Sequence, residues 1–328
     1  MKKSAVLTVL IVFILVTLAG CYRGPVAETV VEDDTRKRVV FSLFNDNNPW
    51  PIALAKDLKE ACEKNGIDLE VINAEGDADR QYSDMYELNE RVTDLVLLSA
   101  VDKEIGEKCL KVLKEKGVPV MLIARNTNGL IGQDSITLIM CDYELVGYSQ
   151  GMSLVRLFGN APCNIIELAG DPGSSNTAMI AMGFRRAIEG YKNFKIITTR
   201  NTTMSTREAL DAMESVIQSQ MTFNAVFCHS DADALGAIQA LKAAGMTPGC
   251  YPEKGNIIIT SNCGFEDAIK AVEIGELYST IDINARMGEL VVNTMNKYWN
   301  GEFITPRIQI AYREITLRNA SEWIGKGY

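Results

Sequence analysis

Histidine is nearly absent from this chain, since one residue, His229, stands among 328. With a single histidine, the chain has little with which to build a histidine-based metal site or a histidine proton relay. The cysteines include no C-x-x-C pair, so the ligand spacing of a structural zinc site is missing as well. The glycine-rich segment 170–175 lacks the lysine of a phosphate-binding loop and the G-x-G-x-x-G pattern. We expect neither a metal nor a cofactor, and we expect Ser174 or Ser175 to cap a helix there.

Basic residues are outnumbered by acidic ones, since 33 Lys and Arg stand against 42 Asp and Glu and give a formal net charge of −9. An acidic protein repels phosphate backbones, so we expect no nucleic-acid partner. Apolar residues make up 47% of the chain, which is enough to build large cores. Beyond the first twenty residues, no apolar run approaches the length that crosses a membrane.

The N-terminus carries the pattern of a secretory signal. Lys2 and Lys3 precede an apolar run over 5–18, and small residues follow before Cys21. The run is shorter than the roughly 18–20 residues that a membrane span needs, although an uncleaved membrane anchor is the alternative. Leu18-Ala19-Gly20-Cys21 looks like a bacterial lipobox, which implies cleavage before Cys21 and a lipid on its thiol.

This pattern divides the start of the chain in two. We expect residues 1–20 to be a lipoprotein signal peptide and residues 21–37 to be a flexible tether, because that segment lacks hydrophobic periodicity. The protein is then exported to the cell envelope and lipid-anchored to a bacterial membrane, on its periplasmic or extracellular face.

The remaining cysteines are odd in number, and several sit in apolar runs where a thiol behaves as a small hydrophobe. We expect them to be mostly free and buried; a disulfide framework is the alternative. They are Cys62, Cys109, Cys141, Cys163, Cys228, Cys250 and Cys263.

Short β-branched runs alternate with longer amphipathic segments after residue 37. Helices are indicated at 52–62 and 234–244, where apolar residues recur at helical spacing and a glycine follows. The alternation predicts parallel sheets with crossover helices, and ten strands fit two α/β lobes better than one sheet. The expected strands are 39–44, 68–73, 95–99, 118–124, 136–141, 164–169, 195–199, 225–228, 256–261 and 278–283.

Polar side chains follow many of these strands. Ligands of open parallel sheets bind beyond the carboxyl ends of the strands, so these side chains are candidates for a binding site. Amides, carboxylates, a guanidinium and an indole suit a neutral, polyhydroxylated ligand. The alternative for each residue is a helix cap or a turn. The residues are 45–50, Glu75, Ser99, Arg125, Asn126, Asp171, Asn201, Ser230, Asp231 and Asn262.

An ordered set of motifs spans the chain after the tether. The segments are 39–50, 118–125, 142–147, 166–170, 225–237 and 279–282. In this order they resemble the type I periplasmic sugar-binding proteins of the ribose-binding-like family. The resemblance implies two Rossmann-like lobes with parallel sheets, joined by a three-strand hinge and closing on a ligand held between them.

The resemblance also implies boundaries and contacts. The chain would cross between lobes near Cys141, Asp282 and Ile310. The N-terminal lobe would be 38–140 plus 284–309, and the C-terminal lobe 141–283 plus 310–328. Trp50 would stack on a sugar ring, and Arg125 would make paired hydrogen bonds to hydroxyls. The candidate ligand-binding residues are Asp46, Asn48, Trp50, Arg125, Asp142, Asp231, Asn262 and Asp282.

Three departures from the family pattern change the expected hydrogen bonds. Ala124 stands where the family has an aspartate, Ser230 stands where it has an asparagine, and 176–181 holds no arginine. Ligand identity therefore does not carry over, and a pentose, a hexose, a modified sugar or a nucleoside remains open.

The resemblance implies a non-enzymatic function. We expect a monomeric substrate-binding lipoprotein that delivers a sugar or sugar-like molecule to an ABC transporter permease. A ligand-sensing module for a chemoreceptor or sensor kinase is the alternative.

A third alternative is an exported hydrolase, because residues 147–151 match G-x-S-x-G. We expect Ser149 to lie inside a helix instead of on the tight turn that such a nucleophile needs. His229, Ser230 and Asp231 are neighbours in sequence and do not form a triad, so we expect His229 to line the cleft or support it from behind.

Overall fold

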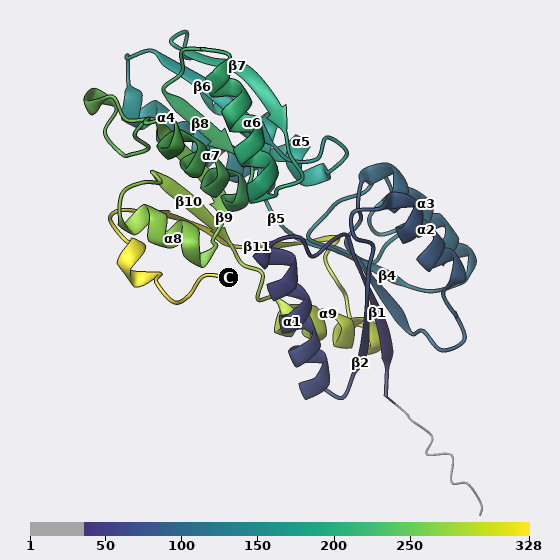
Figure 1. The fold of residues 1–328 in the computed structure, drawn as a ribbon. Helices are drawn as coiled ribbons and strands as arrows, with labels where there is room; N and C mark the ends of the chain where they lie inside the picture. Colours follow the sequence, from purple (N-terminus) through teal and green to yellow (C-terminus); the bar gives the residue numbers. More distant parts are fainter. Residues whose placement is uncertain (1–35) are drawn as a thin grey trace, which may run out of the picture. The chain divides into compact units, whose positions relative to one another are not determined.

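The computed structural model describes residues 36–328, which contain two six-stranded sheets (Figure 1). The predicted signal peptide, Cys21 and nearly all of the predicted tether lie outside the described residues. Among residues 36–328, we find no helix that combines the length and the apolar character required to cross a membrane.

The first sheet has the strand order β11-β5-β4-β3-β1-β2, with every neighbouring pair parallel. Helix α1 packs on α9 and α2 packs on α3, and the two pairs cover opposite faces (Figure 1). The strands are β1 (Arg38–Leu43), β2 (Asp68–Asn73), β3 (Leu95–Leu98), β4 (Val120–Ile123), β5 (Leu138–Cys141) and β11 (Arg307–Ile310). The helices are α1 (Pro49–Lys64), α2 (Ala78–Glu87), α3 (Lys103–Glu115) and α9 (Gly288–Trp299).

The second sheet has the order β12-β10-β9-β8-β6-β7. Its pairs are parallel except β12, which runs antiparallel to β10. The strands are β6 (Cys163–Ala169), β7 (Phe194–Asn201), β8 (Ala225–Cys228), β9 (Ile258–Cys263), β10 (Ser279–Ile283) and β12 (Tyr312–Thr316). The helices are α4 (Tyr143–Phe158), α5 (Ser175–Ile188), α6 (Thr206–Gln218), α7 (Asp231–Ala243) and α8 (Glu266–Glu273), with short 3₁₀ turns η1 (Pro252–Lys254) and η2 (Ala320–Glu322).

The chain passes between the two sheets three times. It leaves the first sheet after β5, returns after β10, and leaves again between β11 and β12. The predicted fold class, two parallel-dominated α/β lobes with a three-strand hinge, is confirmed. Strands β11 and β12 are not among the ten predicted ones, because they are only four and five residues long and polar or charged residues separate their apolar ones.

Helix starts follow the capping chemistry of the sequence. The Asn48 side chain caps α1 by accepting from the Trp50 backbone N–H, and Pro49 occupies the first turn. Ser230 caps α7 in the same way through the Asp233 N–H. Ser174 is the N-cap residue of α5 as predicted, but its side chain makes no capping hydrogen bond. Both predicted helices, at 52–62 and 234–244, lie within α1 and α7 except for one terminal residue.

Glycines bring α4 and α5 into close contact. A methyl group on Gly147 would collide with the Ile180 carbonyl, and one on Gly183 would collide with the Glu144 carbonyl. Ser149 therefore belongs to a tightly packed helix, as predicted, and its hydroxyl lies 3.5 Å from the Tyr312 hydroxyl. The strand-to-helix turn of a hydrolase nucleophile is not formed at this position.

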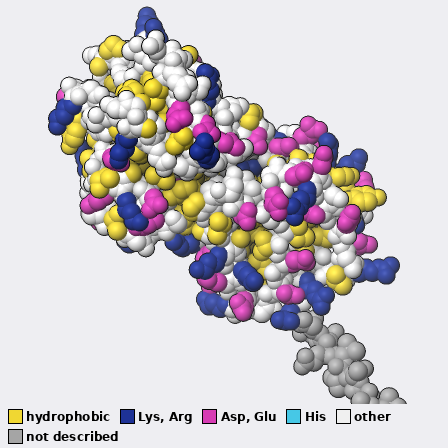
Figure 2. Space-filling model, in the orientation of Figure 1, with side chains coloured by type: hydrophobic (Ala, Val, Ile, Leu, Met, Phe, Trp, Pro, Cys, Tyr) yellow, Lys and Arg dark blue, Asp and Glu magenta, His cyan; other side chains and the backbone are white. Residues whose placement is uncertain are grey.

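The prediction of mostly free and buried cysteines is confirmed, since the seven cysteines within residues 36–328 are free and six of them are buried. Acidic and basic side chains are interspersed over the face shown in Figure 2, without a large patch of one sign.

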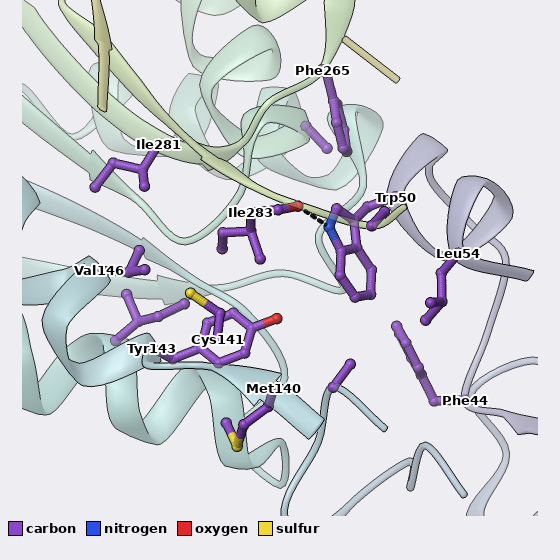
Figure 3. Close-up of a cluster of buried hydrophobic side chains, with 14 of the residues drawn as sticks. Phe44, Trp50, Leu54, Met140, Cys141, Tyr143, Val146, Phe265, Ile281 and Ile283 are labelled. Atoms are coloured by element: carbon purple, nitrogen blue, oxygen red, sulfur yellow. Dashed lines mark hydrogen bonds between the residues drawn. The ribbon is translucent and has the colours of Figure 1, made fainter. Parts of the chain in front are cut away.

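Buried side chains from both sheets meet where the chain crosses between them. Trp50 of α1 lies beside Ile283 at the end of β10, and Tyr143 and Cys141 lie close to both (Figure 3). This hinge cluster adjoins a cavity between the ends of strands from both sheets, because Trp50, Tyr143 and Ile283 also line that cavity.

Candidate ligand-binding site

A cavity of about 360 Å³ lies where loops from the two sheets converge, and we call it the outer chamber. Its volume lies at the lower end of the range found for small-molecule sites. Its walls come from the segments that follow β1, β2, β3, β4, β6 and β7, that is, from the carboxyl ends of strands in both sheets. The lining residues are 44–48, Glu75, Gly76, Val101, Arg125, Asp171, Thr203 and Met204.

A smaller space of about 40 Å³, the inner chamber, adjoins the outer one. The two chambers share Phe44, Asn48, Arg125 and Met204, so they are parts of one site. The inner chamber reaches the ends of β8, β9 and β10. Its other lining residues are Trp50, Pro51, Tyr143, Asn176, Ile180, His229, Asn262, Cys263 and Ile283.

Arg125 lies at the junction of the two chambers. Its guanidinium stacks on the Phe44 ring at 3.5 Å, and Nη1 donates to the carbonyl oxygens of Ala100 at 3.2 Å and Val101 at 2.7 Å. Its Nε is buried without a partner. Burial lowers the pKa of Arg125 to about 10, so it remains charged at neutral pH. An uncommitted buried donor on a fixed cation is suited to hold a ligand hydroxyl.

The loop after β1 carries amides into the outer chamber. The Asn45 Oδ1 is buried without a partner. Asn47 donates from Nδ2 to the Thr203 carbonyl at 2.9 Å, which joins this loop to the segment after β7. A second link is made where the Asn126 N–H donates to the Ser175 hydroxyl at 3.0 Å. Loops from the two sheets are therefore bonded to each other at the edges of the cavity.

Trp50 and Asn262 lie deeper. The Trp50 indole Nε1 donates to the Ile283 carbonyl at 2.6 Å, so one edge of the ring is held in place while the side chain lines the inner chamber. Asn262, at the end of β9, is almost fully buried and donates from Nδ2 to Gln150 Oε1 at 3.5 Å.

His229 enters the inner chamber from the end of β8 with its imidazole fully buried. Its Nε2 lies 3.2 Å from Glu167 Oε1, and its Nδ1 has no partner. This placement agrees with the prediction of a cleft residue. No group of three or more His, Cys, Asp or Glu side chains within residues 36–328 is arranged to hold a metal ion.

The structure brings together five of the eight candidate residues. Asp46, Asn48, Trp50, Arg125 and Asn262 line one or both chambers, while Asp142, Asp231 and Asp282 line neither. Of the wider ring of polar residues, Asn45, Asn47, Glu75 and Asp171 also line the outer chamber. Asn48 both caps α1 and faces the site, so the capping and binding interpretations are compatible.

The three remaining aspartates have other surroundings. Asp142 caps α4 by accepting from the Leu145 N–H and lines a separate hollow. Asp231 is fully buried and accepts from two hydroxyls and two backbone N–H groups. Asp282 lines a different hollow, whose other lining residues include Arg313 and Tyr328. Burial, together with the nearby Asp231, raises the pKa of Asp282 to about 6.

Sequence reasoning missed several lining residues. Phe44 reads as the last apolar residue of a strand, and Met204 lies in a loop three residues beyond β7. Met204 has a backbone φ of 58°, which is uncommon for a residue other than glycine. Tyr143 and Ile180 are apolar positions of helices, and no sequence signal separates them from ordinary core residues.

Comparison with known proteins is consistent with this geometry. A family model described as "Periplasmic binding protein domain" matches residues 39–303. The galactofuranose-binding protein YtfQ of Escherichia coli (strain K12) is 28% identical over 263 residues, which cover 79% of this chain and 81% of that protein. The ribose import binding protein RbsB of the same strain is 25% identical over 287 residues, covering 87% and 91%.

A solved structure is similar over most of the chain. The periplasmic binding protein component of the arabinose ABC transporter from Shewanella sp. ANA-3, bound to α- and β-L-arabinofuranose, matches with a TM-score of 0.82 at 25% identity. The match covers 88% of this chain and 95% of that one. The similar proteins are named as binding proteins, not as enzymes.

Proposed function

Because this chain belongs to the periplasmic binding protein domain family, we propose that it captures a monosaccharide in its two-chambered cavity and delivers it to an ABC importer. Asp46, Asn48, Trp50, Arg125 and Asn262 contact the sugar in this proposal. Asp142 caps α4, Asp231 accepts hydrogen bonds from its own surroundings and Asp282 lines a different hollow, so the proposal gives none of the three a contact with the sugar.

One observation carries the proposal. The cavity is lined from the strand ends of both sheets, and it holds buried polar atoms that the protein leaves without partners: Asn45 Oδ1, Arg125 Nε and His229 Nδ1. Buried polar groups are nearly always hydrogen-bonded, so groups left open around a cavity indicate a polar ligand. Donors and acceptors together, next to aromatic faces, match the hydroxyls and C–H faces of a sugar.

The names of similar proteins narrow the ligand class. They include a galactofuranose-binding protein, a ribose import protein and an arabinose transporter component seen with arabinofuranose. We therefore place pentoses and hexoses, with furanose rings first, ahead of nucleosides. The departures at Ala124 and Ser230 keep the choice among these sugars open.

We extend the proposal to the cell surface. The lipobox-like Cys21 would anchor the protein to the membrane of the cell envelope, and the tether would let a monomeric binding body reach the permease. Closure of the two lobes on the sugar would create the surface that the permease recognises.

The test is calorimetric titration of the full-length chain with D-ribose, L-arabinose, D-galactose and adenosine, together with thermal unfolding at each saturating concentration. We expect one of the three sugars to release heat and to raise the melting temperature by mass action. Binding of adenosine alone would replace the sugar by a nucleoside, and no binding of any of the four compounds would contradict the proposed ligand class.

A matched pair of variants ties binding to the cavity. Arg125→Ala removes the stacked guanidinium, and we expect about a 100-fold loss of affinity because hydrogen bonds to a charged group are lost. Arg91→Ala changes an exposed arginine in the same part of the chain and serves as the control. Equal affinities of the two variants would place binding elsewhere.

The anchor is tested separately. Cys21→Ser is expected to release the protein from the membrane fraction while sugar affinity is unchanged. Retention of the variant in the membrane fraction would show that another element holds it there.

A further inference from the structure

The strongest unexplained group in the cavity is the imidazole of His229. It is the one histidine of the chain, and its side chain is fully buried at the end of β8. One ring nitrogen has a carboxylate partner, and the other has none. An unpaired buried nitrogen costs stability unless something else bonds to it.

The carboxylate beside His229 is held in its ionised form. Glu167, on β6, accepts two hydrogen bonds from Arg185 of α5, at 2.9 and 2.7 Å, and one from the Thr199 hydroxyl at 2.6 Å. Burial alone would raise the pKa of Glu167, but the hydrogen bonds from His229, Arg185 and Thr199 outweigh it and lower the pKa to about 2. Glu167 is therefore an acceptor only.

An acceptor at this position selects one protonation state of the ring. The Nε2 of His229 must carry a proton to bond to Glu167 at 3.2 Å, because an unprotonated Nε2 would face the carboxylate oxygen lone pair to lone pair. A second proton on Nδ1 would leave a buried cation with an unused donor. Burial, opposed by Glu167 and assisted by Arg185, lowers the pKa of His229 and keeps the ring neutral.

The neutral ring then presents Nδ1 as a pure acceptor. His229 lines the inner chamber, and its Nδ1 is a buried acceptor there without a protein partner. The Phe227 ring packs against the imidazole at 4.8 Å, and Phe227 in turn stacks on Phe184 at 3.7 Å. The ring is thus held by bonding on one edge and by aromatic packing on its side.

We propose that His229 is a specificity-determining residue of the cavity, whose unprotonated Nδ1 accepts a hydrogen bond from a ligand hydroxyl, and that Glu167 is the positioning residue that fixes this tautomer. The ligand half of this proposal rests on the proposed function. A sugar with a free hydroxyl at that place fits, whereas a deoxy, O-methyl or phosphorylated analogue brings no matching donor and is rejected.

The single histidine makes the tautomer directly measurable. In the full-length chain labelled with ¹⁵N-histidine, a long-range ¹H–¹⁵N spectrum at neutral pH and without ligand reports one imidazole. We expect the proton on Nε2 and none on Nδ1. A proton on Nδ1, or on both nitrogens, would overturn the proposal.

Glu167→Gln tests the positioning role. A glutamine amide can accept from Nε2–H or donate to a bare Nε2, so we expect the second tautomer to appear. Glu144→Gln is the matched control, because Glu144 also pairs with an arginine of α5, Arg186, but does not contact His229. A wild-type spectrum for Glu167→Gln would remove Glu167 from the proposal.

The proposed hydrogen bond from the ligand to His229 is tested through the ¹⁵N resonance of Nδ1. Titration with D-ribose, L-arabinose and D-galactose is followed by calorimetry and by the Nδ1 signal in parallel. We expect the sugar that releases heat to shift the Nδ1 resonance as it donates to it. Heat without a shift would overturn the acceptor role alone. No heat from any sugar would contradict the proposed function and this half with it, while the ligand-free spectrum still decides the tautomer.

Two substitutions separate ligand contact from structural support. His229→Asn places an amide oxygen near the position of Nδ1 and loses the Glu167 contact. His229→Gln keeps a donor for Glu167 and loses the Nδ1 acceptor. We expect His229→Gln to weaken binding of the active sugar about tenfold, the size of one hydrogen bond, and His229→Asn to weaken it less. The reverse order would show that His229 acts only by supporting Glu167.

Discussion

The indole Nε1 of Trp50 donates a buried hydrogen bond of 2.6 Å to the carbonyl oxygen of Ile283. The two residues are far apart in sequence, and they join the first turn of α1 to the end of β10, where the chain crosses between the sheets (Figure 3). One bond therefore connects the wall of the cavity with the hinge.

Trp50→Phe keeps an aromatic ring and removes this donor. The Ile283 carbonyl retains a longer bond of 3.4 Å from the Tyr328 hydroxyl, so we expect a loss of about 1 kcal/mol in the free energy of unfolding. Urea unfolding measures it. Trp299→Phe is the control, since its indole N–H donates no hydrogen bond that is seen among residues 36–328, and an equal loss in both variants would assign the effect to ring size.

Gly147→Ala is expected to destabilise the protein by about 3 kcal/mol or more, because the added methyl group meets the rigid Ile180 carbonyl and forces α4 and α5 apart. Gly190→Ala adds the same methyl group in open space and is expected to change stability by less than about 0.5 kcal/mol. Urea unfolding of both variants checks the pair, and a tolerated Gly147→Ala would mean that the helix contact can relax.

Asp231→Ala is expected to lower the free energy of unfolding by about 3–5 kcal/mol. It leaves the Gly264 and Phe265 N–H groups and the hydroxyls of Ser261 and Thr280 without their acceptor. Asp231→Asn should lose much less, because its amide oxygen still accepts from the backbone while the hydroxyls can turn to accept.

The same variants separate structure from binding at this position. If Asp231 supports the fold without touching the ligand, Asp231→Asn keeps the wild-type sugar affinity within about twofold. A tenfold loss of affinity in a stably folded Asp231→Asn would return Asp231 to the binding site, as the family resemblance implies.

Asp233 predicts a pH dependence of stability. Burial raises its pKa to about 7 in the folded protein, although Thr202 and Ser230 donate to it. An acid with a raised folded pKa binds its proton more tightly when folded, so its effect on stability is most favourable below about pH 4. That favourable effect is lost as pH rises from about 4 to 7. Asp282 adds to the wild-type profile in the same direction, since its pKa is also raised.

The contribution of Asp233 is isolated by the difference between wild type and Asp233→Asn, measured by urea unfolding from pH 4 to 8. We expect this difference to fall with rising pH and to level off above pH 7. Asp211→Asn, an exposed change on α6, is the control. A flat difference would mean that Asp233 is ionised throughout.

Much of the fold could be predicted from the amino-acid sequence. Continuously apolar runs such as 95–98 are buried on both faces of a sheet, and periodic runs such as 52–62 are helices, because burial imposes these patterns on the sequence. Strands β11 and β12 escaped this reasoning. They are four and five residues long and polar residues interrupt their apolar ones, whereas the longer edge strands β2 and β7 were predicted.

The candidate site residues also include some that the sequence predicts and some whose surroundings it does not predict. Asp46, Asn48, Arg125 and Asn262 could be named because polar residues after parallel strands converge at one edge of a sheet. The same rule also selected Asp231, whose surroundings turn it into an internal acceptor for its own loop. Which way a side chain turns after a strand depends on neighbours that are distant in sequence.

Local periodicity and composition predicted the α/β class, two lobes and a candidate site beyond the strand ends, and they favoured free, buried cysteines over a disulfide framework. Which polar atoms have no partner depends on contacts between distant parts of the chain. Glu167, Arg185 and Thr199 come from β6, α5 and β7, and only the folded chain brings them beside His229 and leaves its Nδ1 without a protein partner. Hydrogen-bond satisfaction is a property of the whole neighbourhood, and no window of sequence contains it.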